Sequence, residues 1–441
     1  MTLPETDCSS ILRKAQDLLD QQQAAQALQL LEHLDWKQPH PFSLLLKGDA
    51  LRRLGRVEAA YPCLQKACRM GREEGASWQA GSYWSFGLTL RALGRFLEAA
   101  EAFLEAVEVN ASHQLSFNAL QFTRLDDAQI ALLLPRLAKV AAIVPTQPLP
   151  QQILAEWERR CGRVEPALVR SYRAAQLATT NRQRRWLDVG AVPTPPEAMI
   201  IGGAKCGTTS LMACLSDHPA IWAHPRKELH FFDNHWSWGS SWFNCQFPVF
   251  RPGSGIVRME ATPNYWQLPE CPGRVKQTAP ECRLIILLRD PVQRALSWFH
   301  HMQRQEDLRG EASEVILREL RELEVLGKNE LDRMGWRSPN CLAGSLYHLF
   351  LPRWQKSVPA GQLLVVCLED LIANPRRSMG RIHDFLGLPS STWGEDHIFP
   401  RANAAPAPSQ ELPPELCRQL KNGLLSAAHD AWSSFRDVTD V

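Results

Sequence analysis

The sequence predicts an all-α helical-repeat domain followed by an α/β domain with a central parallel sheet. Two similar helical segments, 49–70 and 88–109, indicate the repeats. Short β-rich apolar runs separated by helical stretches after residue 197 indicate the sheet, because strands covered by helices on both faces are apolar throughout. The proline-rich AVPTPPE at 191–197 separates the two patterns, since proline neither continues a helix nor donates to a ladder.

The two repeat segments share Leu-Gly-Arg, and each has an alanine five positions after the glycine. Ala60 and Ala99 occupy that position, and a weaker copy at 15–34 puts Ala27 there, at intervals of 33 and 39 residues. Helical hairpins with small packing residues and a period of about 34 residues resemble tetratricopeptide repeats, which stack to bury their apolar faces. A generic helical bundle is the alternative. We expect repeats over 1–110, a helical linker region over 111–195 and the α/β domain over 196–441.

Composition narrows the class of partner and the compartment. A net charge of +2 on 441 residues gives no reason to expect nucleic acid as a partner. The N-terminus has no basic segment followed by an apolar one, and no apolar stretch has transmembrane length, so we expect neither a secretory signal nor a membrane span. The 12 cysteines are scattered without a CxxC pair, which favours reduced thiols and a cytoplasmic protein.

Four short β-rich runs are predicted to be strands of the sheet. They are AMII at 198–201, GIVRME at 255–260, LIILL at 284–288 and LLVVCL at 363–368. Longer helical stretches separate them, as expected for parallel strands joined by helical crossovers.

The stretch GGAKCGTTS at 202–210 joins the first strand to a helix and predicts an anion site. Free amides at a helix start and the positive end of its dipole favour an anion. Gly207 permits close backbone approach, and Thr208 and Thr209 are placed to cap the helix and to donate hydroxyl hydrogen bonds. Lys205 precedes Gly207, whereas a nucleotide-hydrolysing Walker loop has its lysine after that glycine. A purely structural turn is the alternative.

A second block, RLIILLRDPVQRALSWFHHM at 283–302, places charged residues after another buried strand. Proline is tolerated in the first turn of a helix, so we expect a helix from Pro291 onward. Arg289 at the strand end and Ser297 two turns along that helix are placed to share a second phosphate, the arginine through a bidentate fork. Taken alone, this block is more typical of an Arg–Asp surface pair that caps a helix.

Together the two blocks resemble the 5′-phosphosulfate and 3′-phosphate motifs of the sulfotransferase family. HPRKELHFFDNHWSWGSSWF at 224–243, MEATPNYW at 259–266 and the segment 344–388 are similar to the branch that contains heparan sulfate sulfotransferases and many bacterial relatives. The resemblance covers roughly residues 196–390 and implies a P-loop-like three-layer sandwich. It also implies in-line sulfuryl transfer from 3′-phosphoadenosine 5′-phosphosulfate, which leaves 3′,5′-adenosine diphosphate, without a metal.

The resemblance assigns roles to individual residues. Lys205 would contact the phosphosulfate and its bridging oxygen, where charge develops as the bond breaks. The residues that would cradle the 5′-phosphate are Cys206, Gly207, Thr208, Thr209 and Ser210. Arg289 and Ser297 would bind the 3′-phosphate, with Arg401 as a further cofactor-binding cation. Glu228 matches the general base, with a plain salt bridge to Lys227 as the alternative. His230 is either a rival base or a support for Glu228.

One departure and several alternatives remain. The heparan sulfate enzymes have Glu-Lys-Thr-Pro, but this chain has Ala261 in place of that lysine. We expect a saccharide hydroxyl as acceptor, with a lipid or polyketide hydroxyl, or a protein tyrosine presented by the repeats, as alternatives. The repeats are expected to hold a protein partner or to mediate self-association. The rival functions are a non-catalytic nucleotide-binding scaffold and a P-loop kinase, which would need the missing Walker lysine.

Overall fold

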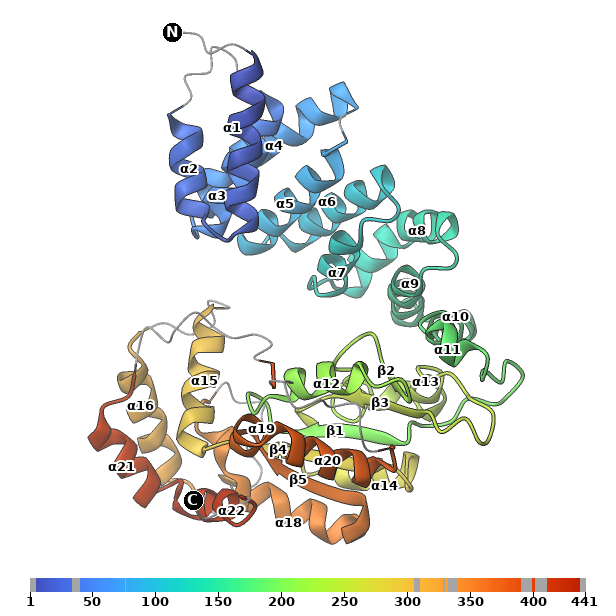
Figure 1. Cartoon of the computed structure of the whole chain (residues 1–441), viewed down its shortest axis with the longest axis vertical. Coiled ribbons are helices and arrows are strands. Elements are labelled where there is room, and N and C mark those ends of the chain that lie inside the picture. The colour runs from blue at the N-terminus through green and yellow to red at the C-terminus, as the bar shows by residue number, and fades with distance from the viewer. Residues whose placement is uncertain are drawn as a thin grey trace. The chain divides into compact units, whose positions relative to one another are not determined.

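The computed structural model describes residues 5–33, 40–75, 77–304, 310–327, 330–331, 340–389, 399–400 and 411–436. The chain forms two compact units, residues 1–177 and 178–441, each with its own elements (Figure 1). This division lies between the domain limits predicted at 110 and 195, which stay predictions. No described helix has the length and apolarity needed to cross a membrane.

The described part of the first unit is a series of helices. They are α1 (Glu5–Asp20), α2 (Ala24–Glu32), α3 (Pro41–Arg53), α4 (Val57–Glu74), α5 (Gln79–Ala92), α6 (Phe96–Val109), α7 (Gln114–Gln121), α8 (Asp127–Ile143), α9 (Pro148–Arg160) and α10 (Val164–Leu177). Gly55 and Gly94 lie in the turns of the α3–α4 and α5–α6 hairpins with φ of +75°, a conformation that glycine adopts without steric cost.

Small residues let the paired helices approach closely. A Cβ on Gly87 in α5 would lie 2.5 Å from Cε1 of Phe103 in α6, and one on Gly48 in α3 would lie 2.4 Å from Cγ of Leu64 in α4. The three alanines at the predicted repeat position, Ala27, Ala60 and Ala99, are fully buried. The sequence pattern therefore identifies the packing points between helices, as expected for stacked helical hairpins.

The second unit contains a five-stranded sheet in which every paired strand is parallel. The strands are β1 (Ala198–Gly202), β2 (Ile221–Ala223), β3 (Val257–Ala261), β4 (Arg283–Leu288) and β5 (Leu363–Cys367), in the order β2-β3-β1-β4-β5. Four of them match the predicted apolar runs within a few residues. The sequence analysis missed β2, which has only three residues and forms the edge of the sheet.

Helices surround the sheet, so the predicted α/β sandwich is confirmed (Figure 1). They include α12 (Thr208–Ser216), α14 (Cys271–Thr278), α15 (Pro291–Arg304), α18 (Tyr347–Ser357), α19 (Leu368–Ala373) and α20 (Pro375–Leu386). Side chains of α12, α19 and α20 share one core cluster with side chains of the strands. Trp266 belongs to a separate aromatic group and packs against Phe350 of α18, with 5.2 Å between ring centroids.

Two segments with predicted site residues leave the sheet side by side. After β1 the chain passes to β2 and β3 on one side, whereas β4 and β5 lie on the other side. The loop after β1 and the segment after β4 therefore meet at the point where the strand order reverses. In open parallel sheets, ligands bind outside the carboxyl ends of the strands at such a point.

Candidate active site

The loop after β1 is shaped to receive an anion at the N-terminus of α12. The N-cap residue is Gly207, whose φ of +91° is left-handed, and no side chain caps the helix. Thr208 and Thr209 lie inside the first turn instead of capping it, because the helix begins at Thr208. The first amides of a helix have no partner within the helix, so this cradle fits a phosphate.

Side chains of α15 and of the junction between β4 and α15 donate hydrogen bonds to backbone carbonyls of the loop. Arg294 is buried and donates from Nε to the Ala204 carbonyl at 3.1 Å and from Nη1 to the Cys341 carbonyl at 2.8 Å. Arg289 donates from Nη1 to the Lys205 carbonyl at 3.4 Å. These bonds hold the loop backbone and place Arg289 beside it. The role of Arg289 at a second phosphate stays a prediction.

The Cys206 side chain faces the protein core. It is fully buried, and its Sγ lies 3.8 Å from the hydroxyl of Tyr347. Burial, the largest effect, raises the pKa of the thiol to about 11. A neutral, inaccessible thiol fills space and does not act as a nucleophile. Only the backbone of this predicted cofactor-binding residue is available to a ligand.

The segment after β4 begins α15 at Pro291, as predicted. Asp290 accepts from the Gln293 amide at 2.9 Å and pairs with Lys421 at 3.1 Å. Ser297 lies two turns along α15 and is partly exposed. Arg401 lies outside the described residues.

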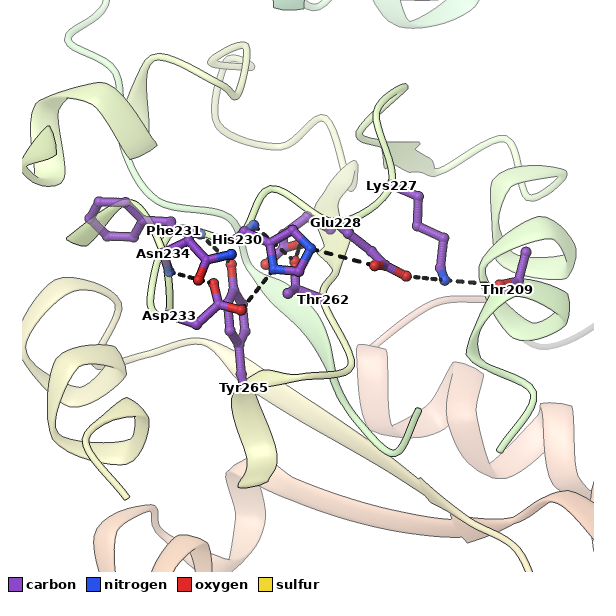
Figure 2. Close-up of polar contacts among 10 residues, drawn as sticks. Thr209, Lys227, Glu228, His230, Phe231, Asp233, Asn234, Thr262 and Tyr265 are labelled. Atoms are coloured by element: carbon purple, nitrogen blue, oxygen red, sulfur yellow. Dashed lines mark hydrogen bonds and ion pairs between the residues drawn. The ribbon is translucent and has the colours of Figure 1, made fainter. Parts of the chain in front are cut away.

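A chain of ionic contacts runs from the loop to the predicted base (Figure 2). Lys227 donates from Nζ to Thr209 Oγ1 at 2.8 Å and pairs with Glu228 Oε1 at 2.9 Å. The other Glu228 oxygen lies 3.5 Å from His230 Nε2. His230 Nδ1 is 2.7 Å from Oδ2 of Asp233, whose side chain is almost completely buried. The structure therefore joins Thr209, which the sequence analysis assigned to the cofactor, to Glu228 and His230, which it assigned to the acceptor hydroxyl.

This network shifts the pKa values of Glu228 and His230 in opposite directions. Burial favours the neutral form of Glu228, but the His230 hydrogen bond and the Lys227 charge outweigh it and lower the carboxyl pKa to about 2. Burial also opposes the charged form of His230, but contacts with Asp233 and Glu228 raise the pKa of the imidazole to about 9. Near neutral pH, Glu228 is thus a carboxylate that can accept a proton, whereas His230 is protonated and cannot.

The backbone of this segment is strained and anchored to β3. Among the described residues, four that are not glycine have positive φ, and three of them are Lys205, Glu228 and His230. The Glu228 amide donates to the Ala261 carbonyl at 3.0 Å, and the His230 amide donates to Thr262 Oγ1 at 3.4 Å. Strained backbone of this kind clusters at functional sites, where the surrounding structure compensates for it.

Glu260 lies fully buried at the end of β3, beneath the network. The Thr262 hydroxyl donates to its Oε2 at 2.8 Å, while Oε1 has no hydrogen-bond partner in the structure. Burial raises the pKa of this carboxyl to about 7. The neighbouring Ala261 is also fully buried, so β3 places no cation at the position where the resemblance expects a lysine.

Sequence reasoning missed the contributions of Asp233 and Thr262 and treated Lys227 only as a salt-bridge partner. The spacing of Asp233, three residues after His230, was a signal that could have suggested their contact. The Lys227–Thr209 bond had no such signal, because the two residues are 18 positions apart on different elements. In the part of the chain that the structure describes, no three His, Cys, Asp or Glu side chains are grouped as a metal site would require.

Comparisons with known proteins agree with this geometry. Residues 195–401 match the family model "Sulfotransferase domain", and residues 43–71 and 80–113 match "Tetratricopeptide repeat". The human heparan sulfate glucosamine 3-O-sulfotransferase 3B1 is 31% identical over 212 residues, which cover 48% of this chain and 51% of that protein. The human heparan sulfate glucosamine 3-O-sulfotransferase 6 is 33% identical over 193 residues, covering 44% and 52%.

A solved sulfotransferase from Alicyclobacillus acidocaldarius is 24% identical, with a TM-score of 0.41, and the match covers 56% of this chain and 98% of that one. The chain thus spans about half the length of the curated relatives it matches. Residues 195–401 are a sulfotransferase domain, and tetratricopeptide repeats precede it in the chain.

Proposed function

We propose that this protein transfers a sulfuryl group from 3′-phosphoadenosine 5′-phosphosulfate to an acceptor hydroxyl. The observation that carries the proposal is the chain of contacts from the anion loop to the base: Lys227 donates a hydrogen bond to Thr209 and forms an ion pair with the carboxylate of Glu228. A phosphate cradle and an ionised carboxylate so close together suit a reaction that moves a group from a bound anion to a hydroxyl. The sulfotransferase domain model over residues 195–401 supports the same reaction.

The donor supplies an activated sulfuryl group, and the loop and α15 supply its binding site. The amides and hydroxyls of Gly207–Ser210 would hold the 5′-phosphate at the start of α12. Arg289 and Ser297 would hold the 3′-phosphate, with the arginine already fixed against the loop by its bond to the Lys205 carbonyl. The uncapped helix N-terminus and this guanidinium fit a ligand with two phosphate groups.

Glu228 is the general base of the proposed reaction. It takes the proton of the acceptor hydroxyl as that oxygen forms a bond to sulfur. Lys205 meets the negative charge left on the 5′-phosphate oxygen when the old sulfur–oxygen bond breaks. His230 orients Glu228 and does not serve as the base, because its contact with Asp233 keeps it protonated.

A saccharide hydroxyl is the proposed acceptor. Two relatives are named for sulfation of heparan sulfate glucosamine. Glu228 lies within residues 195–401, which match the sulfotransferase domain model. We also propose that the tetratricopeptide repeats recruit a protein partner or a second copy of the chain, and the cytoplasmic location stays a prediction. Lipid or polyketide hydroxyls and protein tyrosine are the alternative acceptors to test beside the saccharide.

Calorimetry with 3′,5′-adenosine diphosphate and with ATP plus magnesium tests the donor site. We expect the wild type to prefer the first nucleotide, and Arg289→Ala to weaken its binding about 10- to 100-fold through loss of a charge-assisted contact. Arg418→Ala is the matched control, because Arg418 is largely exposed on α21 (Pro414–Asn422). Equal affinity for both nucleotides would favour the kinase alternative. An unaffected Arg289→Ala variant would contradict the assigned 3′-phosphate site.

A further inference from the structure

Lys227 contacts both the first turn of α12 and the proposed base (Figure 2). We infer that Lys227 is a donor-responsive cation: it pairs with Glu228 as in this structure, moves to the sulfuryl end of the bound donor, and thereby releases Glu228 to accept a proton. This inference rests on the proposed function and adds a residue and an order of events to it.

The position of the ammonium supports a contact with the donor. Lys227 Nζ lies 2.8 Å from the hydroxyl of Thr209, the second residue of α12. An anion held by the first amides of that helix lies beside the same hydroxyl, so the ammonium reaches it with a small movement of a flexible four-carbon stem. The Lys227 side chain is 27% exposed and is therefore not locked inside the core.

The charge balance supports the movement. In this structure the ammonium faces one carboxylate, and the competing partner would be a phosphosulfate that brings further negative charge close to the same position. Ala261 offers no cation from β3. Lys227 therefore supplies a positive charge beside the sulfuryl group in addition to Lys205, where β3 supplies none. Its attraction to the donor increases with the negative charge on the donor.

Movement of Lys227 away from Glu228 would increase the proton affinity of that carboxylate. The groups that face Glu228 are Lys227 and His230, and behind the imidazole stand Asp233 and Glu260. With Lys227 paired, the pKa of the carboxyl is about 2, and such a carboxylate is a weak proton acceptor. Loss of the Lys227 contact removes one of the two partners that lower that pKa, while the His230 contact stays, so Glu228 becomes a stronger proton acceptor when the donor is bound.

Calorimetry on Lys227→Met tests the donor contact. We expect its affinity for 3′-phosphoadenosine 5′-phosphosulfate to fall about 10- to 100-fold, and its affinity for 3′,5′-adenosine diphosphate, which has no sulfuryl group, to change less than about threefold. Lys356→Met is the matched control, since Lys356 is an exposed lysine of α18. Retained binding of the product nucleotide shows that the variant is folded, and Lys227→Gln repeats the test with a polar side chain.

The outcomes separate this inference from the proposed function. Equal losses for both nucleotides, or no loss for either, would overturn the role of Lys227 while leaving the donor site intact. A wild type that binds neither nucleotide would overturn the proposed function itself. The release of Glu228 has its own readout in carbon NMR of its carboxyl, whose pKa should be higher with the donor bound than with the product nucleotide. In Lys227→Met that difference should shrink, and an undiminished difference would refute the release.

Discussion

The paired His230 and Asp233 give the sharpest physical prediction about the site. We consider Asp233→Asn, which keeps the shape of a buried side chain but removes the negative charge 2.7 Å from His230 Nδ1. Burial lowers the pKa of the ring, and without the Asp233 charge the main group that still raises it is Glu228. The pKa of His230 should therefore fall from about 9 back toward 6.5.

The magnitude follows from the pKa itself. A change from 6.5 to about 9 corresponds to roughly 3 kcal/mol of favourable interaction with the charged ring, at about 1.4 kcal/mol per pH unit. Asp233 makes the larger share, so Asp233→Asn should lose about 2 kcal/mol of unfolding free energy at pH 6.5. Because the folded-state pKa is raised, this stability is complete below pH 6.5 and is lost as the pH rises through about 9.

Two measurements check this prediction. Carbon NMR of labelled histidine, with His230→Gln for assignment, reports the ring pKa, and urea unfolding between pH 6 and 10 reports the stability. The control is Asp430→Asn on the exposed side of α22 (Ser426–Ser433), which should leave both unchanged. A wild-type His230 that titrates near 6.5, or an Asp233→Asn variant that titrates like the wild type, would refute the reasoning and restore His230 as a candidate base.

Three further predictions concern packing, reactivity and a buried carboxyl. Gly87→Ala should lower the free energy of unfolding by about 1–3 kcal/mol, because its methyl group would clash with Phe103. Gly81→Ala in the same helix has open space around the methyl group and should raise it by up to about 1 kcal/mol. Urea unfolding of both variants measures the two changes. Cys206 should resist iodoacetamide at pH 8 in the folded protein, and Cys206→Ala should bind 3′,5′-adenosine diphosphate normally; rapid labelling with loss of binding would contradict its place in the core. Glu260 binds its proton more tightly in the folded than in the unfolded chain, so the free energy of unfolding should fall by about 3 kcal/mol as the pH rises from 4.5 to 7. Glu260→Gln should remove this pH dependence, as measured by urea unfolding at several pH values.

The predictable part of the fold is the part that local pattern determines. Continuous apolar runs predicted β1, β4 and β5, because a parallel strand covered on both faces is mostly apolar. The run that predicted β3 also contains Arg258 and Glu260, which are buried in the strand. The edge strand β2 was missed, since three residues are too few to show a pattern. The repeat signal at Ala60 and Ala99 also came from local packing, because only small side chains fit where helices meet.

The site was harder to predict because its contacts depend on backbone geometry. Left-handed conformations at Glu228 and His230 turn their side chains toward each other, and residue spacing does not encode this. The bond from Lys227 to Thr209 depends on how β2 and α12 are placed, which requires the tertiary fold. An acidic residue such as Glu260 would be expected at the surface, so its complete burial could not be foreseen.

Transfer of labelled sulfur from 3′-phosphoadenosine 5′-phosphosulfate to heparan-type oligosaccharides, lipid and polyketide hydroxyls and tyrosine peptides tests the central claim most directly. It should be run with the wild type and Glu228→Gln after both are shown to bind 3′,5′-adenosine diphosphate. We predict that the wild type sulfates the saccharide, and that the variant transfers at least about 100-fold more slowly because it has lost the general base. An equally active Glu228→Gln variant, or a wild type that binds the donor but transfers sulfur to none of these acceptors, would contradict the account.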